Sequence, residues 1–274
     1  MSTCTSVAGA LARRYGSLIL LGMTACSGGA PDPNLTKIDD MEGTSGFIEW
    51  TSPTSTKPGG WGAALWAPMP DDTQADHLLP MAASAGGAWS YEAVPSPYQT
   101  LPGILSKSAA RLRTTSPLVN EWGAGMGFDF AAPPARPVDL SPYQGITFWG
   151  RAEAGAGPTQ ISVQIQDSNT DPRGNVCDKN MPDSDQRSCY NAFEFSVDLT
   201  DTFTRYTVHF SQFKQSAFGY RIVPSVLQLD KIYSLAFGVW TPGGACQAPV
   251  VCAGGVSPTL TFDIWIDDLY LVNK

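Results

Sequence analysis

Charged side chains are scarce in this chain of 274 residues, where Asp, Glu, Lys and Arg together make up 15%. The 17 basic residues are outnumbered by 25 acidic ones, which gives a net charge of −8 at pH 7. This balance excludes nucleic acid as a partner, because its recognition requires clustered Lys and Arg. The chain has two histidines, His77 and His209, which excludes a His-rich metal site.

The chain also lacks any sustained helical period of apolar residues. Glycine (27) and proline (22) are frequent instead, and aromatic residues reach 11%. This composition is typical of many short strands joined by turns. Because no internal repeat or shift in composition divides the chain, we predict a single folded domain over residues 37–274, and we expect a monomer.

The first 25 residues carry the pattern of a secretory signal. Arg13 and Arg14 precede a short apolar run, Leu18–Ala25. The run is too short for a membrane span, and its charged flank is typical of an exported protein. We therefore expect residues 1–25 to be a signal peptide that is removed on export.

Cys26 directly follows this signal. The segment Met23-Thr-Ala-Cys26 resembles the bacterial lipobox, whose Cys becomes the lipid-modified N-terminus, and Ser27 suits sorting to the outer membrane. We predict lipidation of Cys26, a flexible tether over residues 26–36, and a location at the cell outer membrane or outside the cell. The lipid anchor would be the only contact with the membrane. The alternative is an ordinary cleaved signal followed by an incidental cysteine.

Four further cysteines lie in two loops. Cys177 and Cys189 share one loop, and Cys246 and Cys252 share the other. An exported protein meets an oxidising compartment, where disulfides persist. Four cysteines allow three connectivities, of which local pairing within each loop is the simplest. Zinc bound by all four is the alternative, but neither pair has the C-x-x-C spacing of such sites.

The stretch Ile161–Leu199 carries the clearest strand signal. Apolar and polar residues alternate on both flanks of a polar loop, and alternate residues of a strand point to opposite faces. We predict an antiparallel pair with one buried face and one polar face. The buried face would hold Ile161, Val163, Ile165, Phe193, Phe195 and Val197.

Eight or more such short strands predict an all-β sandwich of two antiparallel sheets. Between Thr44 and Pro117 the pattern is weaker. It predicts short strands near Trp61–Trp66, Ala88–Glu92 and Ala109–Thr114, joined by long loops.

Five ordered segments mark the chain from its start to its end. They are Asp39-Asp-Met-Glu-Gly, Asp139-Leu-Ser-Pro-Tyr-Gln-Gly-Ile-Thr-Phe-Trp, Tyr206-Thr-Val-His-Phe-Ser-Gln-Phe, Leu229-Asp-Lys-Ile-Tyr-Ser-Leu-Ala-Phe and Phe262-Asp-Ile-Trp-Ile-Asp-Asp-Leu. Their order and spacing resemble the galactose-binding-like jelly-roll superfamily, in particular its glucan- and xylan-binding carbohydrate-binding modules. The resemblance spans nearly the whole chain after Thr36 and implies a jelly-roll β-sandwich. The insertions over residues 44–117 and the cystine loops depart from a minimal module, so no particular sugar is implied.

The resemblance implies a structural calcium ion between the first and last strands. Glu42 and Asp267 match the positions whose carboxylates would bind it, and Asp40, two residues before Glu42, is the third predicted ligand. Calcium takes six to eight oxygen ligands. The neighbouring carboxylates Asp39–Asp40 and Asp267–Asp268 would repel each other without a cation or a proton. The alternative is that they are solvated charges at strand ends.

The resemblance also implies a sugar site, for which the polar face of the Ile161–Leu199 pair is the candidate. Sugar rings present apolar C–H faces and hydroxyl groups, so their sites combine aromatic rings with bidentate polar side chains. Taken singly, an outward Gln is usually only hydrated, and an outward Trp is often covered by a loop. The predicted ligand-binding residues are Gln164, Gln166, Asp167, Glu194, Tyr220, Arg221 and Trp240.

These observations predict a non-catalytic lipoprotein of the cell envelope that binds a polysaccharide or oligosaccharide. A structural or protein-interaction lipoprotein is the alternative. A glycoside-active enzyme would need two carboxylates across the scissile bond, for which only Glu194 and Asp167 are candidates. Nucleophile-elbow, catalytic-triad and nucleotide-binding patterns are absent from the sequence.

Overall fold

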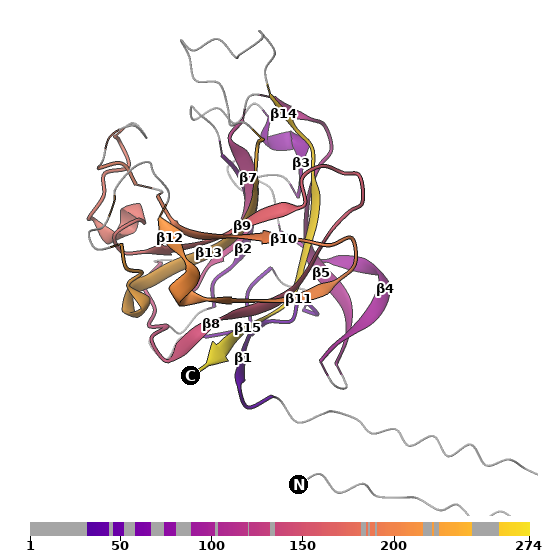
Figure 1. The fold of residues 1–274 in the computed structure, drawn as a ribbon, viewed down its shortest axis with the longest axis horizontal. Coiled ribbons are helices and arrows are strands. Elements are labelled where there is room, and N and C mark those ends of the chain that lie inside the picture. Colours follow the sequence, from indigo (N-terminus) through magenta and orange to yellow (C-terminus); the bar gives the residue numbers. More distant parts are fainter. Residues whose placement is uncertain are drawn as a thin grey trace, which may run out of the picture.

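Two antiparallel sheets lie face to face in the computed structural model of the chain, and the hydrophobic core fills the space between them (Figure 1). The predicted fold class, an all-β jelly-roll sandwich of two antiparallel sheets, is confirmed. The structure describes residues 32–43, 46–51, 58–66, 74–80, 89–101, 104–119, 121–131, 135–181, 185, 187–189, 191–215, 221, 225–242 and 258–274.

Several predictions fall outside these residues: the signal peptide, Cys26, Tyr220, Cys246 and Cys252. In the part of the chain that is described, no helix is long and apolar enough to cross a membrane. Its helical segments are short 3-10 turns at Ala75–His77, Pro172–Gly174, Phe210–Gln212 and Leu229–Lys231.

The seven-stranded sheet is built around the C-terminal strand. In it β15 (Asp263–Asn273) pairs on one side with β8 (Tyr143–Ala152) and on the other with β5 (Ile104–Thr114). The first strand, β1 (Leu35–Asp39), pairs with residues 269–272 of β15. Because β1 begins at Leu35, the last two residues of the predicted tether belong to the sheet instead. The strand order is β11 (Thr204–His209), β8 (Tyr143–Ala152), β15 (Asp263–Asn273), β5 (Ile104–Thr114) and β3 (Leu78–Leu79), with β1 (Leu35–Asp39) on β15 and β4 (Glu92–Leu101) on β5.

The six-stranded sheet contains the predicted strand pair. Ile165 lies opposite Phe193 and Ile161 opposite Val197 in an antiparallel register, as the alternation predicts. The order is β12 (Lys214–Gln215), β10 (Phe193–Asp198), β9 (Gln160–Asp167), β13 (Ile232–Trp240), β7 (Gly123–Asp129) and β2 (Trp61–Trp66). A small separate pair joins β14 (Thr259–Leu260) to β6 (Leu118–Val119).

The core forms where the apolar faces of the two sheets meet. Ile161, Val163 and Ile165 are at most 1% exposed. Phe148 of β8 and Phe237 of β13 meet across the sandwich edge to face, with ring centroids 5.0 Å apart. Each such side chain contributes about 1.5–3 kcal/mol by leaving water, so the inward faces of the strands determine the fold.

The strand predicted near residues 88–92 begins only at Glu92, and the strand predicted near residues 109–114 is the second half of β5; β4 and β5 form one longer hairpin. Pro95 and Pro97 lie inside β4, where their missing N–H groups argue against a strand. They are tolerated because β4 pairs only with β5 and is therefore an edge strand. The hairpin covers part of the outer face of the seven-stranded sheet, where Tyr98 stacks on Phe203 at 4.2 Å.

Candidate functional site

The strand register brings three predicted side chains together on the outward face of the six-stranded sheet. Gln164 of β9 lies opposite Glu194 of β10, and Gln166 follows Gln164 on the same side of β9. All three are half-buried. Arg221 is exposed, and no contact joins it to these residues in the described part of the chain, while Tyr220 lies outside that part. We call the following residues the polar face: Ser162, Gln164, Gln166, Glu194 and Ser234.

Hydrogen bonds within the polar face hold its side chains in place. Ser162 Oγ donates to Glu194 Oε2 at 2.9 Å, and Gln164 Nε2 donates to the same hydroxyl at 3.4 Å. On the next strand, Ser234 Oγ donates to Gln166 Oε1 at 3.1 Å. Each amide keeps further donor and acceptor capacity for a ligand. The face is therefore a preformed set of polar groups that can bind hydroxyls.

Next to the polar face, β13 and β7 present a strip of small residues. Ala236 and Gly238 of β13 pair with Gly127 and Gly125 of β7. A side chain at position 127 would place its Cβ 2.4 Å from the carbonyl oxygen of Leu235, so packing alone requires glycine there. No side chain longer than a methyl group rises from these four positions, of which Gly125 and Gly238 are buried and Gly127 and Ala236 are half-buried.

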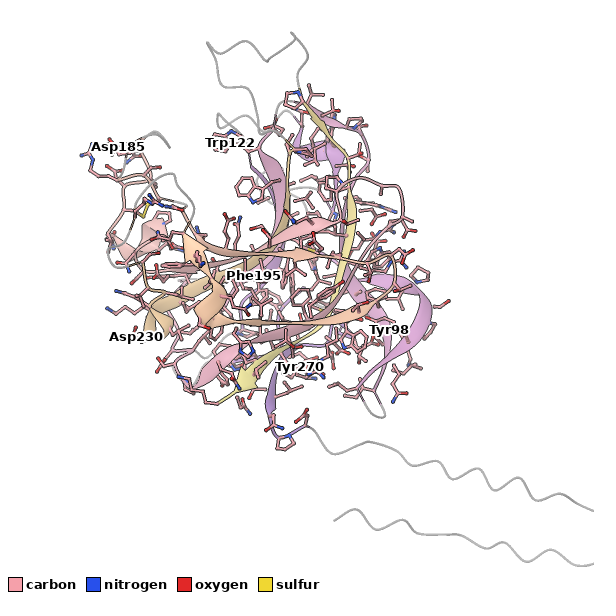
Figure 2. All side chains as sticks on the ribbon, viewed as in Figure 1. Tyr98, Trp122, Asp185, Phe195, Asp230 and Tyr270 are labelled. Atoms are coloured by element: carbon pink, nitrogen blue, oxygen red, sulfur yellow. A yellow bond between two sulfur atoms is a disulfide. The ribbon has the colours of Figure 1, made fainter. Side chains whose placement is uncertain are left out.

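Two tryptophans lie where β13 ends and β7 begins. Trp240 is the last residue of β13, pairs with Gly123 and is 37% exposed. Trp122 is half-buried and directly precedes β7, where its carbonyl accepts a hydrogen bond from Thr241 N at 2.7 Å. Figure 2 shows Trp122 beside β7. The sequence did not reveal Trp122, because it lies outside any alternating run.

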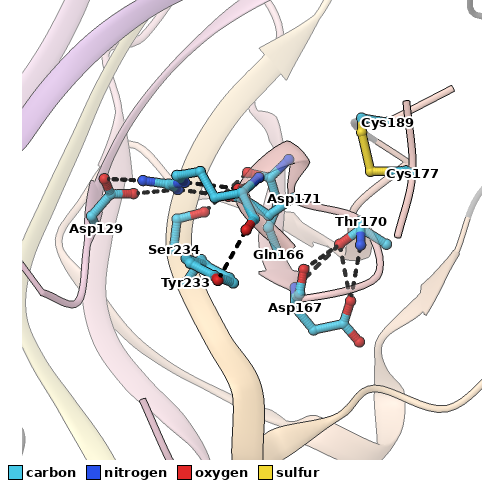
Figure 3. Close-up of polar contacts among 10 residues, drawn as sticks. Asp129, Gln166, Asp167, Thr170, Asp171, Cys177, Cys189, Tyr233 and Ser234 are labelled. Carbon is cyan, nitrogen blue, oxygen red and sulfur yellow. Dashed lines mark hydrogen bonds and ion pairs between the residues drawn. A yellow bond between two sulfur atoms is a disulfide. The ribbon is translucent and has the colours of Figure 1, made fainter. Parts of the chain in front are cut away.

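Asp167 has a different role from the one predicted. It is fully buried, and its Oδ1 accepts a hydrogen bond from Asn169 N at 3.0 Å. The same oxygen accepts from Thr170 N at 3.2 Å (Figure 3). Its Oδ2 accepts from Gln228 N at 3.1 Å. The carboxylate thus shapes the start of the β9–β10 loop and ties it to the segment before β13, and is not presented to a ligand.

Arg173 is a residue that the sequence analysis missed. Its guanidinium makes a two-pronged ion pair with Asp129 of β7, with N···O distances of 2.5 and 2.8 Å. It also binds Asp171, whose hydrogen bonds raise the pKa of the guanidinium, and lies 5.0 Å above the ring of Tyr233. Because Asp129 is 44 residues away from Arg173, no local pattern could have revealed the pair.

The residues predicted to bind calcium are engaged in other contacts. Asp267 is fully buried, accepts hydrogen bonds from Tyr98 Oη at 2.5 Å and from Ser106 Oγ, and takes a third from Asp268 N. Burial raises the pKa of Asp267 to about 8. Glu42 Oε1 accepts from the backbone N–H groups of residues 107 and 108 at 2.6 and 2.9 Å.

The carboxylate of Asp268, which follows Asp267 in the chain, accepts fewer hydrogen bonds than that of Asp267. Asp268 is 1% exposed, and its Oδ2 makes no hydrogen bond within the described part of the chain. Burial raises its pKa to about 6, and repulsion from Asp40 and Glu42 adds to the shift. Asp40 itself is bound by Lys37 Nζ at 2.9 Å. Among the described residues, one carboxylate trio has oxygens within 4.8 Å of one another, and it is Asp39, Asp40 and Glu49 rather than the predicted set.

Comparisons with known proteins yield structural likenesses alone. No protein-family model matches the chain, and no curated protein matches it. It is similar to CtCBM11 in a solution structure (14% identity, TM-score 0.43, 92% of this chain and 99% of the other). It is also similar to a putative sugar binding protein from Bacteroides thetaiotaomicron (11% identity, TM-score 0.39, 88% of this chain and 100% of the other). A third similar structure is that of an exo-beta-agarase (12% identity, TM-score 0.36, 67% of this chain and 22% of the other). These likenesses are too weak to transfer a ligand or a residue's role to this chain.

Proposed function

We propose that the protein binds a neutral polysaccharide or oligosaccharide on the outward face of the six-stranded sheet and does not cleave it. The observation that supports this function is the polar face itself. Two amides and a carboxylate are held by hydrogen bonds to the hydroxyls of Ser162 and Ser234 beside a strip of small residues, with Trp240 at one end. Amides bind vicinal hydroxyls through paired donors and acceptors, and an indole ring packs against sugar C–H groups.

The charges around the face favour a neutral ligand. Glu194 and Asp129 lie on or beside it, and the two-pronged pair with Asp129 already engages the cation of Arg173. Lys214 lies opposite Glu194 on β12, so one cation and one anion face each other in the strand register there. A carboxylated or sulfated sugar would therefore meet no excess of positive charge, and like charges placed together disfavour binding.

Affinity electrophoresis against soluble β-glucan, xylan and mannan, with alginate as an acidic polymer, tests the proposal. We expect retardation by at least one neutral polymer and none by alginate. Gln166→Ala and Trp240→Ala should each weaken retardation, whereas Gln99→Ala, an exposed glutamine on β4, should not. Absence of retardation by every neutral polymer, or retardation unchanged in both site variants, would refute the proposal.

We also propose that the protein is a lipoprotein of the cell envelope, anchored through Cys26. The lipobox-like segment before Cys26 supports this location. Metabolic labelling with an alkyne fatty acid, followed by fractionation of membranes, tests it. Cys26→Ser should abolish the label and release the protein from the membrane fraction, and a wild-type protein without label would disprove the anchor.

We further propose that calcium stabilises the region where β1 and β15 meet. The buried Oδ2 of Asp268, which lacks a hydrogen-bond partner among the described residues, supports this site. Hard oxygen ligands are what calcium requires, so Asp40 and Glu42 would join Asp268, while Asp267 stays engaged by its hydroxyl donors. The melting temperature should rise with calcium but not with magnesium, and Asp268→Asn should remove the rise. A melting temperature that is indifferent to calcium and to chelator would exclude the ion.

A further inference from the structure

The loop between β9 and β10 contains the same small structural unit twice. In Asp171-Pro-Arg173, the Arg173 backbone N–H and Nε both donate to Asp171 Oδ1, at 2.8 and 2.7 Å, and Nη2 donates to Oδ2 at 2.6 Å. In Asp185-Gln-Arg187, the corresponding three distances are 2.8, 3.1 and 3.0 Å. Each arginine is thus held by the aspartate two residues before it, in the same way.

The two units differ in what else the arginine contacts. Arg173 also pairs with Asp129 of β7 through two N···O contacts of 2.5 and 2.8 Å. Its guanidinium lies over the ring of Tyr233 in β13, and its carbonyl accepts a hydrogen bond from Tyr233 Oη at 3.4 Å. The side chain of Arg187 is 66% exposed, and its contacts with Asp185 and Met181 stay inside the loop. Among the described residues, only the first unit therefore connects the loop to the sheet.

The place where Arg173 meets the sheet adjoins the polar face. Asp129 pairs directly with Ser234, and Ser234 Oγ donates to Gln166 Oε1 (Figure 3). Two further constraints act on the same loop. Asp167 fixes its first turn, and the disulfide between Cys177 and Cys189 closes its outer part. Without the Asp129 contact, the disulfide would leave the loop compact but not joined to β7.

We propose that Arg173 is a positioning residue that fixes the first part of the β9–β10 loop, residues 168–181, as a rigid rim beside Gln166 before any ligand arrives. This inference rests on the proposed function, because the rim matters for binding only if the polar face is the sugar site. A loop that must be ordered during binding weakens affinity, since the ordering entropy is then lost in the binding step. Lysine cannot replace Arg173, because a two-pronged contact needs the planar guanidinium.

The experiment compares Arg173→Ala, Arg173→Lys and the matched control Arg187→Ala in the full mature chain. Binding is measured by affinity electrophoresis with soluble β-glucan, xylan and mannan. Amide hydrogen exchange of residues 174–181 is followed by mass spectrometry, with and without the polymer that retards the wild type. We expect both Arg173 variants to bind about tenfold more weakly. They should also exchange faster in this segment and regain protection at saturating polymer, whereas Arg187→Ala should behave as the wild type does.

A second variant keeps the test decisive if Arg173→Ala does not fold. Asp129→Asn leaves the Asp171–Arg173 unit intact and weakens only its connection to β7, so it should reproduce the loss of affinity and the faster exchange. Wild-type affinity in Arg173→Ala or Asp129→Asn, or an equal loss in Arg187→Ala, overturns the inference. Failure of the wild type to bind any of the polymers refutes the proposed function instead. In that case the exchange comparison alone decides whether Arg173 holds the loop.

Discussion

Asp167→Ala should lower stability without weakening sugar binding, because the structure makes this residue a support of the loop rather than a ligand. The carboxylate is fully buried and accepts hydrogen bonds from Asn169 N, Thr170 N, Thr170 Oγ1 and Gln228 N. In the variant, Thr170 keeps a partner, since both of its donors also reach the backbone carbonyl of residue 167. The N–H groups of Asn169 and Gln228 lose the carboxylate that they share.

The expected cost follows from those two donors. A buried or half-buried donor that loses its acceptor costs about 1–3 kcal/mol, so Asp167→Ala should lower the free energy of unfolding by about 3 kcal/mol. Asp178→Ala is the matched control. Asp178 also accepts from the N–H two residues later, Asn180 N at 2.9 Å, but this hydrogen bond is exposed. Water can replace it, and the cost should stay below about 0.5 kcal/mol.

Urea unfolding followed by tryptophan fluorescence measures both variants, provided that the dependence on urea is the same as in the wild type. Binding of each variant to the retarding polysaccharide is measured in parallel. The reasoning is wrong if Asp167→Ala and Asp178→Ala are equally stable. It is also wrong if Asp167→Ala keeps its stability and loses sugar binding, because Asp167 would then be a ligand as the sequence suggested.

Three further predictions concern other parts of the molecule. Burial raises the pKa of Asp267 from 3.8 to about 8, so between these values the folded state holds a proton that the unfolded state releases. Measured in chelator, the contribution of this proton to the free energy of unfolding is fully present below pH about 4 and is lost as pH rises to about 8. Melting temperatures across this range should fall with pH in the wild type and fall less in Asp267→Asn. Replacing Cys177 and Cys189 by Ser, which opens a disulfide of sequence separation 12, should cost about 3 kcal/mol in urea unfolding, and reductant should then destabilise the variant less than it destabilises the wild type. Phe237→Ala, at a site that is 0% exposed, should cost about 3–5 kcal/mol, whereas Phe47→Ala, at 55% exposure, should cost little; equal costs would contradict the described core.

Local periodicity was enough to predict the strand pair and its buried face. Ile161, Val163 and Ile165 repeat at the strand period and are buried, and their partners on β10 follow in register. Strand alternation is a local property, so no tertiary information is needed to recognise it. The same holds for the Cys177–Cys189 disulfide, whose partners lie in one loop.

The roles of the carboxylates could not be predicted, because they depend on contacts between distant segments. Asp267 looks in the sequence like a charge at a strand end. It is buried because Tyr98 and Ser106 of the β4–β5 hairpin, 169 and 161 residues away, cover it. The hairpin itself was obscured by the prolines of β4. Asp167 likewise finds one of its donors, Gln228, 61 residues away.

The contacts within the chain distinguish residues that the fold itself requires from residues that have polar groups left for a ligand. Position 127 needs glycine because a Cβ there would clash with the carbonyl oxygen of Leu235. Asp167 and Asp267 accept hydrogen bonds from groups within the chain. None of these three residues therefore supports a binding site. Gln164 and Gln166 differ from them, because within the described part of the chain each makes a single side-chain hydrogen bond at one end of its amide, to Ser162 or Ser234. The unused ends of these amides are what a hydroxyl-rich ligand can bind. The sugar-binding proposal therefore depends on the central polar residues of the six-stranded sheet, and not on the carboxylates at the strand ends.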